Sequence, residues 1–261
     1  MKDITIIVPI HQYNDTENGE LLRAALNSVV KCQEQYTDKL SVMTVGPSDI
    51  KSEIEDILNE VFGGTEIKYK YLVNKGKTDY CSQINTAAKN VKTTYFSILE
   101  MDDQYLPKWF VLAQSYFAGH EDVSVFLPLN VQNDGNSSRY SNEMVWAMSF
   151  SNELGMIDSD CLQTSAAFNL TGGIFNTKDF IHVKGYDPTV DIAFNYELLM
   201  RMTADYKLKV YVVPRLGYVH FIGRKNSLLD IYNQQFTDET ASECFNAVRR
   251  KYISDSDSVE K

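Results

Sequence analysis

Residues 94–107 read Thr-Tyr-Phe-Ser-Ile-Leu-Glu-Met-Asp-Asp-Gln-Tyr-Leu-Pro. The first six form a short apolar run that is typical of a buried strand, and three carboxylates follow it at once, Glu100, Asp102 and Asp103. A carboxylate pair spaced i, i+2 in a turn after a strand directs two oxygen ligands toward one crevice, as a hard divalent cation requires. The alternative is a solvated acidic turn between a strand and a helix, so the surrounding sequence must decide.

The chain before this segment alternates between two patterns. Short apolar runs that end at Pro, Gly or polar residues predict strands at residues 4–10, 40–45 and 67–73. Apolar residues at helical spacing predict helices around residues 21–30, 50–61 and 80–91. Ser48 and Thr78 are the expected N-caps of the second and third helices. Strands alternating with helices predict an α/β fold with a doubly wound sheet, in which ligands bind beyond the carboxyl ends of the strands.

The second half of the chain is less regular. The pattern predicts a helix at 107–116, a strand at 123–129, a helix at 191–204, a strand at 208–213 and two short helices within 227–252. Turn-forming residues dominate 130–143, which we expect to be a mobile surface loop. The polar tail at 254–261 is expected to be disordered.

Composition limits the class of protein. The 261 residues carry 35 acidic and 25 basic side chains, and the net charge of −10 disfavours non-specific binding to nucleic acid without excluding a nucleic-acid substrate. The four cysteines are widely scattered, which predicts buried reduced thiols. The apolar run near the N-terminus is too short for a signal peptide, and no stretch approaches the roughly 20 apolar residues of a membrane span. We therefore expect a cytoplasmic protein of one large domain.

Several motifs occur in an order that resembles glycosyltransferase family 2. They are Ile-Ile-Val-Pro-Ile-His-Gln-Tyr-Asn at 6–14, Asn74-Lys75-Gly76 with Asn85 and Ala88, the segment 97–107, Gly172-Gly173 with Phe175, and Val-Lys-Gly-Tyr-Asp at 183–187. The resemblance spans residues 4–227 and implies a GT-A (Rossmann-like) doubly wound mixed sheet with a C-terminal helical extension. It also implies one domain over 1–253, with a nucleotide-binding half at 1–106, an acceptor-side half at 107–226 and C-terminal helices at 227–253.

The resemblance also implies an activity. A sugar would pass from a UDP- or GDP-sugar donor to an acceptor hydroxyl, with inversion at the anomeric carbon. Mn²⁺ or Mg²⁺ would stabilise the charge that builds on the leaving diphosphate. Its ligands would be Asp102, helped by Glu100 and His220. A single His beside a strand is otherwise a packed structural residue.

Residues in contact with the donor follow from the same resemblance. They would be Pro9, His11, Tyr13, Asn14, Asn74, Lys77, Glu100, Met101, Gly172, Gly173, Arg224 and Lys225. The last two belong to a Gly-containing loop that could close over the diphosphate, and their alternative role is a solvated basic turn.

Two positions depart from the family pattern. Residues 44–48 read Thr-Val-Gly-Pro-Ser, which removes the carboxylate that usually meets the base of the nucleotide. Asn195 stands where the family has a catalytic carboxylate, and a neutral amide cannot take a proton from the acceptor. Asp191 and Glu197 are the nearest substitutes, with Asp191 preferred if the helix begins beside it. The alternative role of Asp191 is a helix N-cap.

Three functions remain open from the sequence. The first is a metal-dependent glycosyltransferase whose acceptor could be a glycan, a protein or a modified nucleic-acid base. The second is a non-catalytic nucleotide- or glycan-binding protein on a decayed glycosyltransferase scaffold, since two carboxylates are missing. The third is a nucleotidyltransferase, but residues 11–19 lack the Gly-rich basic phosphate loop that it requires.

Overall fold

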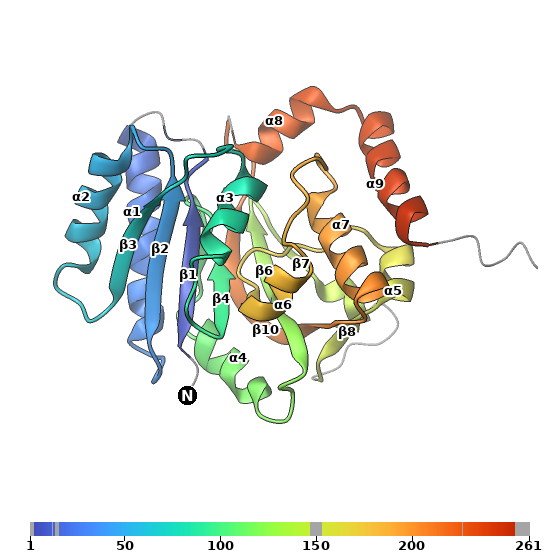
Figure 1. Ribbon diagram of the computed structural model, residues 1–261, viewed down its shortest axis with the longest axis horizontal. Coiled ribbons are helices and arrows are strands. Elements are labelled where there is room, and N and C mark those ends of the chain that lie inside the picture. Colours follow the sequence, from blue (N-terminus) through green and yellow to red (C-terminus); the bar gives the residue numbers. More distant parts are fainter. Residues whose placement is uncertain (1–2, 12, 14–15, 147–152, 226, 254–261) are drawn as a thin grey trace, which may run out of the picture.

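The computed structural model describes residues 3–11, 13, 16–146, 153–225 and 227–253, which surround a mixed β-sheet (Figure 1). The strands are β1 Ile4–Pro9, β2 Leu40–Gly46, β3 Lys68–Val73, β4 Tyr95–Ile98, β5 Gln104–Tyr105, β6 Val123–Asn133, β7 Ser138–Ser141, β8 Gly155–Ile157, β9 Ile174–Asn176 and β10 Lys209–Phe221. Their order is β3-β2-β1-β4-β9-β6-β10-β5, with β7 paired to β6 and β8 to β10. β3, β2, β1 and β4 are parallel, whereas β9 runs antiparallel to both β4 and β6.

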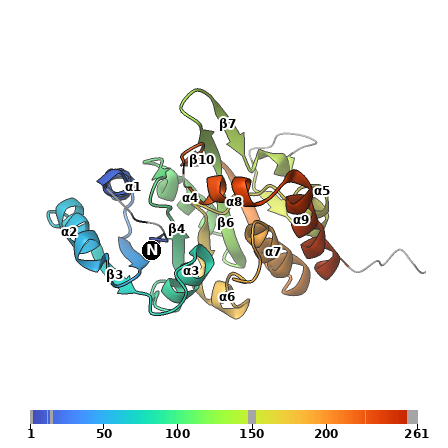
Figure 2. The same ribbon diagram turned by 90° about the horizontal axis from the view of Figure 1, so that it is seen from above.

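Helices cover both faces of this sheet (Figure 2). They are α1 Thr16–Gln33, α2 Lys51–Phe62, α3 Tyr80–Ala88, α4 Trp109–Phe117, α5 Ser159–Thr164, α6 Thr177–His182, α7 Phe194–Met200, α8 Leu228–Gln235 and α9 Asp238–Tyr252, with a 3₁₀ turn η1 at Glu143–Trp146 and a π-helical turn η2 at Arg201–Asp205. Successive residues of β1 point to opposite faces: Ile6 and Val8 pack with α1, α2 and α4, and Ile7 with α3, α6 and α7. The expected doubly wound mixed sheet is therefore confirmed.

Two expected helix caps are wrong by one or two residues. α2 follows Ile50, which makes no capping hydrogen bond, instead of being capped by Ser48. α3 is capped by Asp79, whose side chain accepts from the Ser82 amide at 2.9 Å, instead of by Thr78. The local backbone angles determine which residue caps a helix. Residue preferences alone therefore locate the cap only to within a residue or two.

The loop expected at 130–143 is a hairpin instead. β6 continues to Asn133 and pairs with β7, and the turn between them is closed by Asp134, which accepts from the amides of Asn136 and Ser137 at 2.8 and 2.6 Å. β6 also pairs with β10 along this stretch. Backbone pairing on both sides therefore overrides the turn-rich composition.

The C-terminal part also differs in detail from the expected pattern. The helix expected at 191–204 begins at Phe194, since the Phe194 amide donates to the Asp191 carbonyl at 3.1 Å in a preceding turn. The strand expected at 208–213 extends to Phe221 through register shifts around Leu216. The two helices expected within 227–252 are confirmed as α8 and α9, which pass over the end of the sheet and down beside α7 (Figure 1). The expected tail at 254–261 lies outside the described residues.

All four cysteines are free thiols; Cys32 and Cys81 are buried, whereas Cys161 and Cys244 are half-buried. Among the helices that the structure describes, none combines the length and the apolar character that crossing a membrane would require.

Candidate functional site

The acidic turn follows the carboxyl end of β4 and is anchored by hydrogen bonds to Tyr218 and Gly172. The Glu100 amide donates to the Tyr218 hydroxyl at 3.0 Å, and the Gly172 amide donates to the Ile98 carbonyl at 2.9 Å. The Met101 side chain is 2% exposed and packs in the core beside α1 and α4. A turn anchored in this way holds its carboxylates in fixed directions.

Asp103 faces inward and orients His220. Its carboxylate is fully buried, accepts from the Phe221 amide at 2.9 Å and lies 2.8 Å from His220 Nδ1. Burial alone would lower the pKa of His220, but the Asp103 carboxylate raises it to about 9. This partner fixes Nδ1 as the inner ring nitrogen, so that Nε2 is left for any further contact.

Asp102 faces the other way and pairs with Arg224. The two side chains approach to 2.6 Å and are 10% and 24% exposed. Arg224 lies in the segment between β10 and α8, and its Nε is buried without a hydrogen-bond partner among the described residues. The guanidinium is therefore only partly satisfied by Asp102 and can accept another anionic partner.

Glu100 lies among these groups and resists ionisation. Its burial, and next the Asp103 carboxylate, raise its pKa to about 8. Ligand atoms of Glu100, Asp103 and His220 lie within 4.8 Å of one another, close enough to hold a metal ion. Of the three expected ligands, the structure brings Glu100 and His220 into this group and turns Asp102 toward Arg224.

Access to the cavity favours Asp102 over Asp103 as a cation ligand. Glu100, Asp102 and His220 line the cavity, whereas Asp103 is buried behind them and already engaged by His220. Burial and the Asp103 carboxylate disfavour a negative charge on Glu100, which a bound cation would offset, and carboxylate with imidazole is a donor set that Mn²⁺ or Mg²⁺ accepts. The residues therefore fit a divalent cation.

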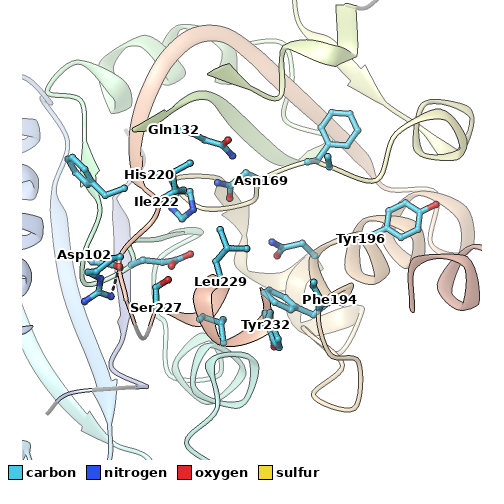
Figure 3. A pocket seen from close by; sticks show the side chains of 18 of the residues that line it. Asp102, Gln132, Asn169, Phe194, Tyr196, His220, Ile222, Ser227, Leu229 and Tyr232 are labelled. Carbon is cyan, nitrogen blue, oxygen red and sulfur yellow. Dashed lines mark hydrogen bonds and ion pairs between the residues drawn. The ribbon is translucent and has the colours of Figure 1, made fainter. Parts of the chain in front are cut away.

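A cavity of about 330 Å³ opens from this charged cluster. It extends between the carboxyl ends of the strands, the start of α7 and the helix α8. Figure 3 shows Asp102 and His220 toward one end, Leu229 in the middle, and Phe194 with Tyr232 beyond it. One end is thus charged and the rest is neutral.

Of the residues expected to bind the donor near β1, His11 lines this cavity. Burial lowers the pKa of His11, its ring lies edge-on to Tyr80, and its Nδ1 has no hydrogen-bond partner among the described residues. An uncharged imidazole with a free nitrogen is suited to a hydrogen bond with a ligand.

The lining of this cavity does not include Pro9, Tyr13, Asn74 or Lys77, which were also expected to contact the donor. Pro9 ends β1, and the Tyr13 hydroxyl donates to Glu53 at 2.9 Å. The Asn74 amide accepts from the Gly76 amide at 3.0 Å and donates to the Lys77 carbonyl at 2.7 Å, so that it shapes its own loop. The contact expected from Asn14 concerns a residue outside the described part of the chain.

The expected glycine contacts have a structural role. Gly172 has φ +75°, and a Cβ there would lie 2.7 Å from the Tyr218 ring. Its carbonyl accepts from Trp109 Nε1 at 2.9 Å, and Gly173 is equally buried. The close approach to Tyr218 therefore requires glycine, and both residues support the acidic turn without lining the cavity. Lys225 is exposed and also lies outside the lining.

Of the three candidates for the catalytic base, Asn195 lines the cavity and Asp191 and Glu197 lie outside its lining. Asn195 lines the cavity and accepts from the Tyr186 hydroxyl at 3.2 Å. Asp191 is exposed and does not line it. The Glu197 carboxylate is 1% exposed, pairs with Arg201 at 2.6 Å and accepts from the Tyr252 hydroxyl, away from the lining. Among the described lining residues, the carboxylates are those of Glu100 and Asp102.

Several lining residues gave no signal in the sequence. Gln132 was assigned to a loop, Asn169 lies in a stretch without a regular pattern, and Leu229 and Tyr232 read as ordinary positions of an amphipathic helix. Three-dimensional proximity alone brings them to the cavity.

Comparison with known proteins is consistent with this arrangement. The family model of Glycosyl transferase family 2 matches residues 5–175. The crystal structure of S. aureus TarS 1–349 in complex with UDP-GlcNAc is similar, with a TM-score of 0.62 and 14% identity over 97% of this chain and 74% of that one. The corresponding complex with UDP has a TM-score of 0.59, also at 14% identity, over 97% and 73% of the chains, and S. aureus TarS itself gives 0.59 at 14% identity over 100% and 46%. None of the curated proteins matches by sequence. The structural similarity shows a GT-A fold.

Proposed function

The chain belongs to glycosyl transferase family 2, and on that premise we propose that it moves a sugar from a UDP-sugar to an acceptor hydroxyl by in-line displacement with inversion. The observation that carries the proposal is the cluster of Glu100, Asp102, His220 and Arg224 at one end of a cavity. UDP as the nucleotide is supported by the complexes of S. aureus TarS with UDP-GlcNAc and UDP.

Each group at the charged end has a proposed task. Asp102, Glu100 and His220 would hold Mn²⁺ or Mg²⁺, which supplies positive charge to the leaving diphosphate when bound. Arg224 would exchange Asp102 for a diphosphate oxygen, since its Nε is without a partner among the described residues. His11 would donate or accept a hydrogen bond at the donor.

The acceptor side lacks an evident base. Asn195 can hold an acceptor hydroxyl by a hydrogen bond but cannot take its proton. This observation favours a second candidate function, a protein that binds a nucleotide or glycan without turnover.

Incubation with UDP-glucose, UDP-galactose, UDP-N-acetylglucosamine and GDP-mannose in the presence of Mn²⁺ tests the proposal. We expect a UDP-sugar to release UDP, and Asp102→Asn to abolish that release. Asp122→Asn is the matched control, because Asp122 is 62% exposed and pairs with Lys209 on the surface. Thermal stabilisation by UDP without product would favour the second candidate, and neither binding nor release would refute both.

A further inference from the structure

The part of the cavity beyond the acidic turn is uncharged among the described lining residues. The titratable lining groups other than tyrosine are His11, Glu100, Asp102, His220 and Arg224, which all belong to the charged end. The rest of the lining comes from Gln132 on β6, the end of β10, the segment 166–169, the start of α7, and the helices α8 and α9. An ion placed there would lose its hydration without gaining an oppositely charged partner.

Apolar and aromatic side chains form most of this neutral part. Leu229 is a large apolar side chain that is 43% exposed and lines this part of the cavity. Phe194 and Tyr232 lie beside it on the same wall, and Figure 3 shows them on the side of Leu229 opposite His220. Such a wall suits a ligand with a flat or apolar face.

Three amides complete the wall, and all three have their oxygen occupied by the protein. Gln132 Oε1 accepts from Arg139 Nε at 2.7 Å, and Asn169 Oδ1 accepts from the Thr171 amide at 2.9 Å. Asn195 Oδ1 accepts from the Tyr186 hydroxyl at 3.2 Å.

The first two contacts fix the orientation of the Gln132 and Asn169 amides, because a guanidinium and a backbone amide can only donate. The Tyr186 hydroxyl donates to Asn195 Oδ1. The NH₂ groups of Gln132, Asn169 and Asn195 have no hydrogen-bond partner among the described residues. The cavity therefore offers neutral donors beside an apolar wall.

We propose that this neutral part binds the acceptor, and that the acceptor is an uncharged glycan. One sugar ring would lie with its apolar face on Leu229, Phe194 and Tyr232, while its hydroxyl oxygens accept from the three amides. The inference rests on the proposed transferase function and names the substrate class of that site.

Other acceptor classes fit the lining less well. A phosphorylated acceptor would place a charge in the neutral part, where no lining side chain among the described residues carries an opposite charge to offset the lost hydration. An aryl or aliphatic alcohol has a single hydroxyl oxygen, the reacting one, and would cover the other amides without an acceptor, and sites built to hydrogen-bond a substrate reject analogues that lack the partner.

Saturation-transfer NMR on the protein loaded with UDP and Mn²⁺ tests the inference. The probes are methyl glycosides and disaccharides of glucose, galactose and N-acetylglucosamine, with glucose 6-phosphate and phenol as the charged and aryl comparisons. We expect signals from at least one neutral sugar and none from the comparisons. Signals from the phosphate or the phenol alone, or from no probe at all, would overturn the inference.

Two variants locate the binding. Leu229→Asp should weaken sugar binding by about tenfold or more, because it places a charge in the apolar wall. Gln132→Met removes one donor at similar volume and should weaken it about threefold to tenfold. Ile181→Asp is the matched control, since Ile181 is a helical residue 44% exposed outside the cavity and its change should leave sugar binding as it is.

UDP affinity, measured separately by calorimetry, distinguishes failure of the glycan inference from failure of the transferase proposal. If the unchanged protein does not bind UDP, the transferase proposal itself is refuted. UDP binding without sugar binding, or sugar binding that Leu229→Asp leaves intact, would refute the glycan inference alone.

Discussion

The carboxylate of Glu197 on α7 stabilises the fold by pairing with Arg201, and a mutation of Glu197 tests this role against that of catalytic base. Its two oxygens accept from Arg201 at 3.0 and 2.6 Å, and Tyr252 and Lys251 reach the same carboxylate from α9. Arg201 is 13% exposed on its side chain and also donates to the Gly185 carbonyl. Glu197→Gln keeps the shape of this cluster and removes its negative charge.

The expected loss of stability follows from the burial of the Glu197–Arg201 ion pair. Removing one partner of a buried ion pair costs about 3–5 kcal/mol, and the partial exposure of Arg201 places this change near the lower value. For a chain of this size each kcal/mol lowers Tm by about 2–4 °C, so we expect a fall of about 6–12 °C. Lys251 is 54% exposed and adds little.

Thermal unfolding followed by circular dichroism, together with UDP binding at 20 °C, measures the effect. UDP affinity should persist, because Glu197 does not line the cavity. Glu243→Gln is the control, since Glu243 pairs with Arg250 on the surface with both side chains 65% exposed, and its Tm should move by no more than about 2 °C. An unchanged Tm for Glu197→Gln with loss of sugar transfer would refute this reasoning and assign the base to Glu197.

Three further changes test other parts of the site. Asn195→Asp places a carboxylate on the cavity wall and should raise the rate of sugar transfer about 100-fold, and an unchanged rate in a product assay would exclude a base at this position. Arg224→Gln removes the cation paired with Asp102 and should raise the Mn²⁺ affinity of the nucleotide-free protein about tenfold by calorimetry, while an equal or weaker affinity would contradict competition between the two cations. Gly172→Ala forces a Cβ to within 2.7 Å of Tyr218 at positive φ and should lower the free energy of unfolding in urea by about 2 kcal/mol or more, whereas a stability near that of the unchanged protein would show that the turn adapts.

The first half of the fold was predictable because its strands are buried on both faces. Ile4–Pro9 and Leu40–Gly46 form continuous apolar runs, and the apolar residues between them recur at helical spacing. A strand, a helix and a second strand in this order can be connected in few ways. The hairpin of β6 and β7 was missed because its side chains alternate weakly and several are exposed. Its stability comes from backbone pairing to β10, which side-chain patterns do not report.

The location of the site was predictable, but the orientation of its groups was not. The acidic turn falls at the carboxyl end of a strand, as the alternation of elements requires. Whether Asp102 or Asp103 faces the cavity depends on His220, more than 100 residues away in sequence. Glu197 did carry a usable signal, since Glu and Arg four residues apart on a helix are spaced to pair with each other.

The short strand β9 has a mechanical consequence for access to the cavity. Its three residues pair with β4 on one side and β6 on the other, and the rings of Phe96 and Phe175 stack at 5.2 Å across the junction. Separation of the two halves of the sheet would break both ladders and expose these rings to water. The sheet therefore acts as a rigid floor that does not hinge. Access to the cavity is therefore governed by its other walls, which include Arg224 and residues of α8.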